Sequence, residues 1–232
     1  MDTIANPLVE PVSRDPNDVR DIVYTATTIQ VAGIYIQLPQ STVICSAITF
    51  VYRFAARSET PIISLPHLSR AALNLACKVH EVPRSERQIH KAIAYAHKCL
   101  LGEDSLIENI QDLAQDEHHL LRVLSFDTHV SSPYSLLMSY LQVTKLHRLG
   151  SLTELTWALT NDCIRCCAFI TVTHQPNLIA GAVLGLALKR LQMSIRECEW
   201  WIIFDIETTQ LNETMEMIDR SIAQWKDWTI KL

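Results

Sequence analysis

A group of cysteines near residue 165 combines side chains whose types and spacing suggest chemistry. Cys163, Cys166 and Cys167 form a Cys-x-x-Cys-Cys cluster, and His174 follows, so the segment contains the ligand types of a zinc site. The helical period, however, places the first two cysteines on an apolar face with Leu155, Leu159 and Ile170. Because free cysteines in such patterns are commonly small buried side chains, we predict core packing here and no metal site.

A second chemical candidate is the adjacent pair His118 and His119, whose imidazoles are suited to acid–base work. Adjacent residues of a helix point about 100° apart, so the two rings cannot share one site, and we expect them to be partly exposed or at an interface. The chain also has no Gly-x-Ser-x-Gly nucleophile motif and no glycine-rich phosphate loop. The sequence therefore predicts no catalytic residue and no cofactor.

Glu117 is the charged residue that fits its surroundings least well. Residues 106–126 have the period of one helix with an apolar face, and Glu117 falls on that face. A carboxylate there is costly unless a partner pairs with it. One interpretation is a glutamate at the edge of a slightly rotated apolar stripe. The other, which we prefer, is that part of this face receives another protein.

The elements that must position these residues all have helical period, and no convincing alternating strand pattern appears. A helix starting at Asp18, with Asn17 or Asp18 as its N-cap, ends before Pro39. The other predicted helices span about 40–57, 67–82, 85–101 and 106–126, and, after a Ser- and Pro-containing linker at 126–133, 133–146, 151–170, 178–191, 200–206 and 211–228. Ser151 and Glu154 have capping-box spacing.

Length and composition restrict the class of protein. The chain has 232 residues, 48% of them hydrophobic, which allows one large domain or two small ones. Lys and Arg total 20 against 25 Asp and Glu, and this net charge of −5 disfavours direct nucleic-acid binding and a polybasic membrane anchor. No apolar run reaches the ~18 residues of a membrane span, and no signal-peptide pattern opens the chain. With 7 cysteines, an odd number, we expect reduced thiols and a nuclear or cytoplasmic location.

An internal repeat divides the chain into two halves. Residues 71–78, AALNLACK, align with residues 182–189, AVLGLALK, with identical Ala, Leu, Leu, Ala and Lys positions. A proline precedes each copy, and each copy lies in a helix rich in small residues, which allow a neighbouring helix to come close. We therefore expect each half to contain about five helices around a central one.

The two halves and two of their motifs resemble the cyclin family. Residues 71–81, AALNLACKVHE, are similar to the cyclin third-helix signature, in which a lysine precedes an acidic cluster. Residues 117–127, EHHLLRVLSFD, are similar to the end of the cyclin fifth helix, in which a glutamate is followed by apolar residues and Leu-x-Phe. The resemblance runs from about residue 18 to 229 and implies an all-α fold of two tandem five-helix cyclin boxes. The implied parts are an N-terminal tail at 1–17, an N-terminal box at 18–130 and a C-terminal box at 131–232.

The resemblance also implies a partner and a site. Cyclins are regulatory subunits that bind and activate cyclin-dependent protein kinases, and their motif lysine and glutamate hydrogen-bond main-chain groups beside the kinase C-helix. By motif position these residues are Lys78 and Glu117, and Glu81 and Phe126 belong to the same surface. A Lys78–Glu117 pair would also explain a glutamate on an apolar face. The implied assembly is a 1:1 heterodimer with a kinase, without cofactor, metal, nucleic acid or membrane.

Some residues depart from the family pattern. His80 stands where a second acid is common, and His119 stands where an apolar residue is usual. The first helix lacks the Met-Arg-Ala-Ile-Leu docking motif of cell-cycle cyclins, so we expect no recruitment of Arg-x-Leu peptides. Residues 31–54 and 157–167 are most similar to transcription-type cyclins, and among them to cyclin-Q. Two alternatives to a kinase-activating cyclin are a DNA-binding factor with two cyclin-like boxes, as in the core of transcription factor IIB, and an adaptor that binds a kinase without activating it.

Overall fold

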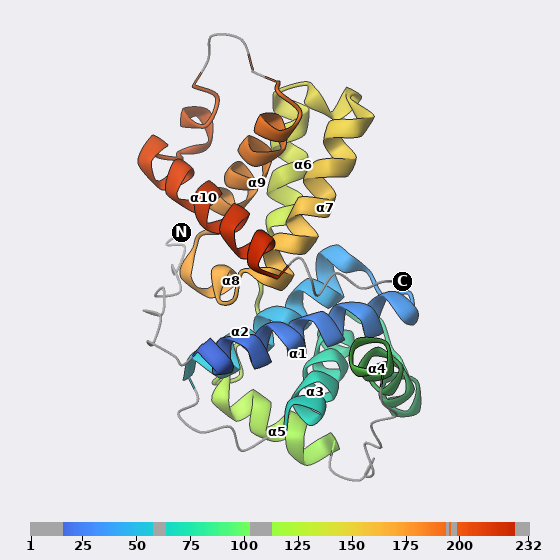
Figure 1. Cartoon of the computed structure of the whole chain (residues 1–232). Coiled ribbons are helices and arrows are strands. Elements are labelled where there is room, and N and C mark those ends of the chain that lie inside the picture. The colour runs from blue at the N-terminus through green and yellow to red at the C-terminus, as the bar shows by residue number, and fades with distance from the viewer. Residues whose placement is uncertain (1–15, 58–63, 103–112, 194, 196–198, 226–232) are drawn as a thin grey trace.

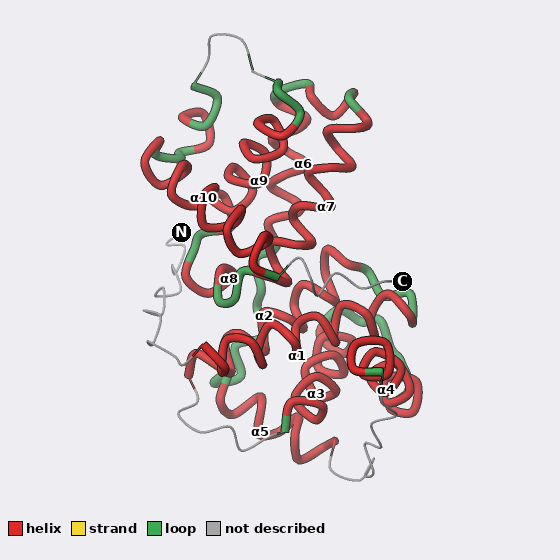
Figure 2. The backbone as a smooth tube through the Cα atoms, viewed as in Figure 1, coloured by secondary structure: helices red, strands yellow, loops and turns green. Residues whose placement is uncertain are grey.

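The computed structural model describes residues 16–57, 64–102, 113–193, 195 and 199–225. Within these ranges the chain consists of helices joined by turns and contains no strand, as Figure 2 shows. Figure 1 shows two groups of helices, α1–α5 in one and α6, α7, α9 and α10 in the other, with the short α8 between them. No helix of the described part has the length and apolarity needed to cross a bilayer.

The first group is built around α3. Its elements are α1 (Pro16–Tyr35), the short π-helix η1 (Gln40–Ile44), α2 (Cys45–Arg57), α3 (Leu65–Val79), α4 (Glu86–Leu101) and α5 (Leu113–Val123). Helix α3 contacts α1, α2, α4 and α5, and its Ala71, Ala72 and Ala76 are fully buried. Small side chains let neighbouring helices approach closely, which is why this helix can be surrounded.

The second group is built around α9. Its elements are α6 (Pro133–Val143), the 3-10 helix η2 (Leu146–Arg148), α7 (Gly150–Cys166), α9 (Pro176–Arg190), the 3-10 helix η3 (Ile202–Phe204) and α10 (Thr208–Gln224). The short α8 (Ile170–Thr173), between α7 and α9 in the chain, contacts both α7 and α2. Helix α9 contacts α6, α7 and α10. At Gly185 an added Cβ would lie 2.9 Å from the Met215 sulfur, so the absence of a side chain lets α10 pack closely. The repeated segments thus occupy equivalent central helices, and the prediction of an all-α fold is confirmed.

Several predicted boundaries were wrong, mostly at turns. Helix α1 begins at Pro16, so Asp18 lies in its first turn rather than at the N-cap. Helix α7 begins at Gly150 after Leu149, and Ser151 makes no cap hydrogen bond, so the predicted capping box is absent. It also ends at Cys166, because Cys167 leaves the helical conformation with a ψ of 86°, and Phe169, with a φ of 67°, is the N-cap of the separate short helix α8. The predicted helix ends at residues 106–112 and 226–228 lie outside the described residues.

The two groups of helices pack against each other through buried side chains. Ile164 and Val172, from the second half, belong to the same apolar cluster as the core of the first half. The Tyr52 hydroxyl oxygen of α2 lies 2.9 Å from the Ile164 carbonyl oxygen and 2.8 Å from the Arg165 carbonyl oxygen, so its one hydrogen is donated to this pair of acceptors. A separate small cluster joins Val23, Cys166 and Trp225, from α1, α7 and the end of α10. Burial and hydrogen bonding therefore fix how the two halves sit together.

Candidate functional site

The candidate site begins with a row of hydrogen-bond donors on α3. Arg70, Asn74 and Lys78 are spaced four residues apart, so a helix places them along one face. Helix α5 packs on α3 and presents two adjacent carboxylates, Asp116 and Glu117, to this row. Every donor of the row bonds one of these two acids.

Asp116 pairs with the buried end of the row. Its Oδ2 atom lies 3.3 Å from the Arg70 Nη2 atom and 3.2 Å from the His67 Nδ1 atom. The Arg70 side chain is almost fully buried, so this ion pair lies inside the protein and locks α5 to α3. A buried arginine of this kind needs such an acid, because removing one partner of a buried pair leaves an uncompensated charge.

Glu117 pairs with the exposed end of the row. The Lys78 Nζ atom donates to Oε1 at 2.7 Å and to Oε2 at 2.8 Å, and the Asn74 amide donates to Oε2 at 2.6 Å. The Glu117 side chain is only 12% exposed, whereas that of Lys78 is 59% exposed. The glutamate is thus held within the protein surface, and the ammonium group that pairs with it faces solvent.

Glu81 lies just beyond the C-terminus of α3. Its φ is 54°, and its amide donates to the Lys78 carbonyl at 3.2 Å while the Val82 amide donates to the Cys77 carbonyl at 3.0 Å. This hydrogen-bond pattern terminates the helix in a left-handed residue, a position where glycine is usual. The Glu81 side chain is exposed and makes no hydrogen bond or ion pair with a described residue, so its carboxylate is available to a partner.

Phe126 is presented by a second left-handed turn at the end of α5. Ser125 and Phe126 have φ values of 55° and 60°, and the Phe126 side chain is 63% exposed. The predicted continuation of the helix to Phe126 was therefore wrong, since α5 ends at Val123.

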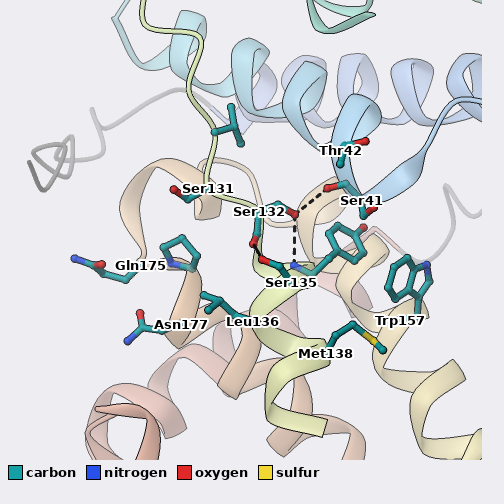
Figure 3. A pocket seen from close by; sticks show the side chains of 13 residues that line it. Ser41, Thr42, Ser131, Ser132, Ser135, Leu136, Met138, Trp157, Gln175 and Asn177 are labelled. Carbon is teal, nitrogen blue, oxygen red and sulfur yellow. Dashed lines mark hydrogen bonds between the residues drawn. The ribbon is translucent and has the colours of Figure 1, made fainter. Parts of the chain in front are cut away.

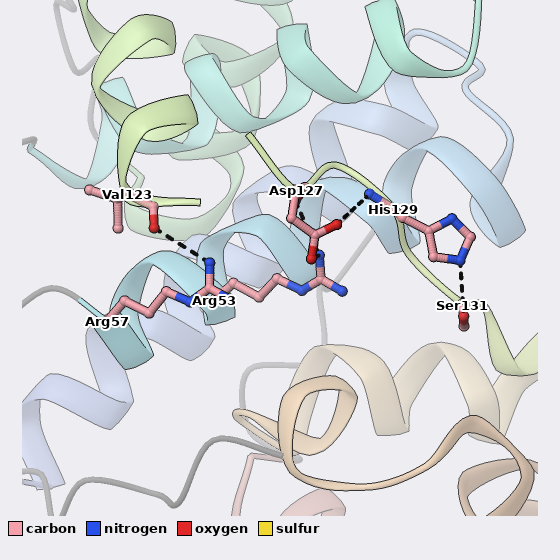
Figure 4. Close-up of polar contacts among 6 residues, drawn as sticks. All are labelled: Arg53, Arg57, Val123, Asp127, His129 and Ser131. Atoms are coloured by element: carbon pink, nitrogen blue, oxygen red, sulfur yellow. Dashed lines mark hydrogen bonds and ion pairs between the residues drawn. The ribbon is translucent and has the colours of Figure 1, made fainter. Parts of the chain in front are cut away.

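Two arginines of α2, Arg53 and Arg57, hold the two ends of this turn through Asp127 and Val123 (Figure 4). Arg53 lies 3.6 Å from the Asp127 carboxylate and 3.3 Å from the Asp127 carbonyl oxygen, and Arg57 donates to the Val123 carbonyl at 3.5 Å. The Asp127 carboxylate also accepts a hydrogen bond from the amide of His129 at 3.1 Å. The turn that exposes Phe126 is thereby tied to the core of the first group of helices.

The structure brings together only two of the four residues named from the sequence. Lys78 and Glu117 are in contact, whereas Glu81 and Phe126 stand at the C-terminal ends of α3 and α5. Sequence reasoning missed the Arg70–Asp116 ion pair and, beside Lys78 and Glu117, the amide of Asn74. The available signal for Asn74 was an amide inside an apolar stretch, one helical turn before the motif lysine.

The cysteine cluster is part of the core, as the helical pattern predicted. Cys163, Cys166 and Cys167 are all buried, and burial raises the pKa of the Cys166 thiol to about 12. Thiols of this kind stay protonated and are poor metal ligands and nucleophiles. Burial lowers the pKa of His174, whose Nδ1 atom lies 2.8 Å from the hydroxyl oxygen of Thr173. Among the described residues no group of three His, Cys, Asp or Glu side chains is placed to hold a metal.

A cleft of about 720 Å³ lies where η1, the linker and the N-termini of α6 and α9 meet (Figure 3). Its described lining combines hydroxyl groups with apolar side chains such as Leu136 and Trp157 and includes no charged residue. The Ser132 hydroxyl donates to the Ser41 carbonyl at 2.8 Å across the cleft edge. The titratable group of the lining is the Tyr134 hydroxyl, whose pKa is raised by burial, and no Asp, Glu, His or Lys side chain of the described residues lines the cleft beside it, so the lining offers no acid–base pair for catalysis.

Comparisons with known proteins identify the fold. The chain superposes on a subunit of the yeast RNA Pol II CTD kinase CTDK-1 complex with a TM-score of 0.72 and 17% identity, covering 94% of this chain and 70% of that one. It superposes on a subunit of the CAK complex from Chaetomium thermophilum bound to ATP-gamma-S with a TM-score of 0.71 and 18% identity, covering 95% and 69%. These neighbours confirm the predicted class, a fold of tandem cyclin boxes.

Sequence relatives refine this assignment, although no protein-family profile matches the chain. Cyclin-L1 of Xenopus laevis is 29% identical over 185 residues, which are 76% of this chain and 37% of that protein. Human cyclin-L2 is 29% identical over 194 residues, 80% of this chain and 37% of that protein. The chain therefore spans little more than a third of the length of these relatives. It is a homologue of transcription-type cyclins, and the narrower similarity to cyclin-Q stays a prediction.

Proposed function

We propose that this chain is a regulatory subunit that binds a cyclin-dependent protein kinase in a 1:1 heterodimer and activates it. The observation that carries the proposal is the Lys78–Glu117 pair, whose nitrogen and oxygen lie 2.7 Å apart at the surface between α3 and α5. The relatives are cyclins, and the fold neighbours belong to the CTDK-1 kinase complex and to the CAK complex bound to ATP-gamma-S, which supports the same partner. The proposed boxes are residues 18–130 and 131–232.

The proposed contact surface comprises Lys78, Glu81, Glu117 and Phe126. Lys78 has three N–H donors, and two oxygens of one carboxylate do not use all of them, while the exposed Glu81 carboxylate supplies acceptors. The exposed Phe126 ring supplies apolar area of the kind that dominates interface energies. The surface therefore offers a donor and an acceptor at the C-terminal end of α3 and an aromatic anchor just after α5, while Glu117 in the middle of α5 orients the donor.

Activation follows if the surface binds the active conformation of the kinase more tightly than the inactive one. In an active kinase the C-helix is turned inward, so that its glutamate pairs with the lysine that positions the ATP phosphates. A subunit that contacts the C-helix only in that position shifts the equilibrium toward it by its differential affinity. This chain's own residues supply binding and orientation, and the chemistry of phosphoryl transfer belongs to the kinase. The transcription-associated relatives support a nuclear location for this activity.

The test is to mutate the pair and to measure kinase binding and activation. A lost charged hydrogen bond at an interface costs about 2–5 kcal/mol, so we expect Glu117→Ala to weaken binding by roughly 30- to 5000-fold. The free chain should lose less stability, because Lys78 is largely solvated before the kinase arrives. Helicity and melting of Lys78→Ala and Glu117→Ala are measured first, followed by their affinity for a purified cyclin-dependent kinase and by its activity.

The second half of the chain provides a matched control. Arg190 of α9 and Asp219 of α10 form a surface ion pair at 2.8 Å; α9 corresponds to α3 in the repeat, and α10 packs on α9 as α5 packs on α3. Asp219→Ala should leave kinase binding unchanged. If Glu117→Ala and Lys78→Ala remain folded and bind and activate the kinase as the parent does, the proposed surface is wrong. Binding without activation would identify the chain as an adaptor instead.

A further inference from the structure

Asn74 is a buried amide in the middle of the candidate site. It is 3% exposed, and its Nδ2 atom lies 2.6 Å from the same Glu117 oxygen that accepts a hydrogen bond from Lys78 at 2.8 Å. Glu117 therefore accepts hydrogen bonds from a neutral donor below the surface and from a charged donor at the surface. None of the motif residues explains why an amide occupies this apolar stretch of α3.

We propose that Asn74 is a positioning residue that holds the Glu117 carboxylate, and through it the Lys78 ammonium group, in the conformation that the kinase recognises. This inference rests on the proposed kinase-binding function. A lysine side chain has several rotatable bonds, and ordering it at the moment of association costs free energy. Because Asn74 already holds the Glu117 carboxylate, Lys78 is ordered before the partner arrives. Less conformational entropy is therefore lost when the kinase binds.

The second half of the chain supplies an internal comparison. In the repeat, Lys78 corresponds to Lys189 and Asn74 corresponds to Gly185. Gly185 has no side chain to donate a hydrogen bond, and Lys189 makes no side-chain hydrogen bond or ion pair with any described residue. The ordered lysine thus occurs in the half that has the amide, and the unanchored lysine occurs in the half that lacks it.

A double-mutant cycle separates positioning from a general contribution to folding. Asn74→Ala, Glu117→Ala and the combined variant are compared by their dissociation constants for the purified kinase that binds the parent chain. We expect Asn74→Ala to weaken binding about tenfold, the effect of one hydrogen bond to a charged group. In the Glu117→Ala background the same change should have no further effect, because the group it positions is gone.

Asn161 offers a matched control, since its Oδ1 atom accepts a hydrogen bond from the Tyr134 hydroxyl in the second half at 2.5 Å. Asn161→Ala should lower the melting temperature and leave the kinase affinity unchanged. A second test keeps the volume of the side chain and removes its donor. Asn74→Asp should weaken binding at least as much as Asn74→Ala, because an aspartate carboxylate has no hydrogen to donate to Glu117 and repels its charge.

The outcomes distinguish the inference from the proposed function. If Glu117→Ala binds the kinase as well as the parent, the proposed surface fails, and the positioning role fails with it. If Glu117→Ala binds weakly but Asn74→Ala binds as the parent does, only the positioning role is overturned. An equal effect of Asn74→Ala in both backgrounds, or parental kinase affinity of a folded Asn74→Asp variant, would also overturn it.

Discussion

Tyr52 provides a test of how the two halves of the chain are held together. Its side chain is 0% exposed, and its hydroxyl lies within hydrogen-bonding distance of two carbonyl oxygens, those of Ile164 and Arg165, at the C-terminal end of α7. Those carbonyls belong to the last turn of α7, and no backbone amide of the described residues that follow donates a hydrogen bond to them. Tyr52→Phe would remove this donor without changing the shape of the ring.

The expected magnitude follows from burial. Leaving a buried acceptor without its donor costs about 1–3 kcal/mol, and the site is too enclosed for water to take the place of the hydroxyl readily. We therefore expect Tyr52→Phe to lower the free energy of unfolding by about 2 kcal/mol. For a chain of 150–250 residues each 1 kcal/mol corresponds to a shift of about 2–4 °C, which gives a decrease in Tm of about 4–8 °C.

The assay is thermal and urea unfolding followed by circular dichroism, with Tyr35→Phe as the control. The Tyr35 ring is exposed and stacks on Tyr95 with a centroid distance of 4.3 Å, so removing its hydroxyl should change stability by less than about 0.5 kcal/mol. Equal stability of Tyr52→Phe and the parent would refute the reasoning, because the cross-half hydrogen bonds would then contribute nothing. A separate unfolding step for each half would show that the hydroxyl couples them.

Three further predictions address the site, the packing and the pH dependence. Phe126→Ala should weaken kinase binding by about tenfold or more and leave Tm nearly unchanged, because the ring is 63% exposed in the free chain. Gly33→Ala should destabilise the chain by about 1–3 kcal/mol, since the new Cβ would lie 2.5 Å from the buried Ile44 side chain. Burial lowers the pKa of His97, so the unfolded chain binds the extra proton first on acidification, and Tm should fall as pH decreases below about 6.5. His97→Gln should make that decrease smaller.

Each of these predictions has a clear contrary outcome. Ile203→Ala removes a similarly exposed side chain from the second half. An equal loss of kinase affinity in Ile203→Ala would show that the effect of Phe126→Ala is not specific to the proposed surface. At Gly150 an added Cβ would have no atom within 4 Å, so Gly150→Ala should be neutral or slightly stabilising. An equal loss of stability in Gly150→Ala would show that the close contact with Ile44 is not what destabilises Gly33→Ala. For His97, the measurement is the slope of Tm against pH in the parent and in His97→Gln. An unchanged slope in His97→Gln would show that the acid-dependent loss of stability does not come from His97.

The sequence allowed the helical class and the central helices to be predicted, because their apolar periodicity is strong. In α4 the ends predicted from the sequence agree with the structure, since Ser85 and Gln88 form a capping box and Gly102 ends the helix with a φ of 73°. The predicted pairing of Lys78 with Glu117 is likewise confirmed by contact distances. Their role at a kinase interface remains a proposal.

Turns that depend on tertiary contacts could not be predicted. Glu81, Phe126 and Phe169 all have positive φ, although none is a residue type that favours this conformation. At Phe126 the conformation coincides with the anchoring of the turn by Arg53 through Asp127, a contact between segments far apart in the sequence. Asn74 was missed for a similar reason, because an amide in an apolar helix becomes informative only once its acceptor on α5 is known.

The small cluster of Val23, Cys166 and Trp225 has a consequence for the order of folding. It joins the first helix to the end of the last described helix, so this contact closes a loop that includes nearly all of the described chain. Contacts of such long sequence separation carry the largest entropic cost of closure and form after the local ones. During synthesis, α1 would leave the ribosome long before Trp225 is made, and Val23 would remain without its last neighbour until translation is nearly complete.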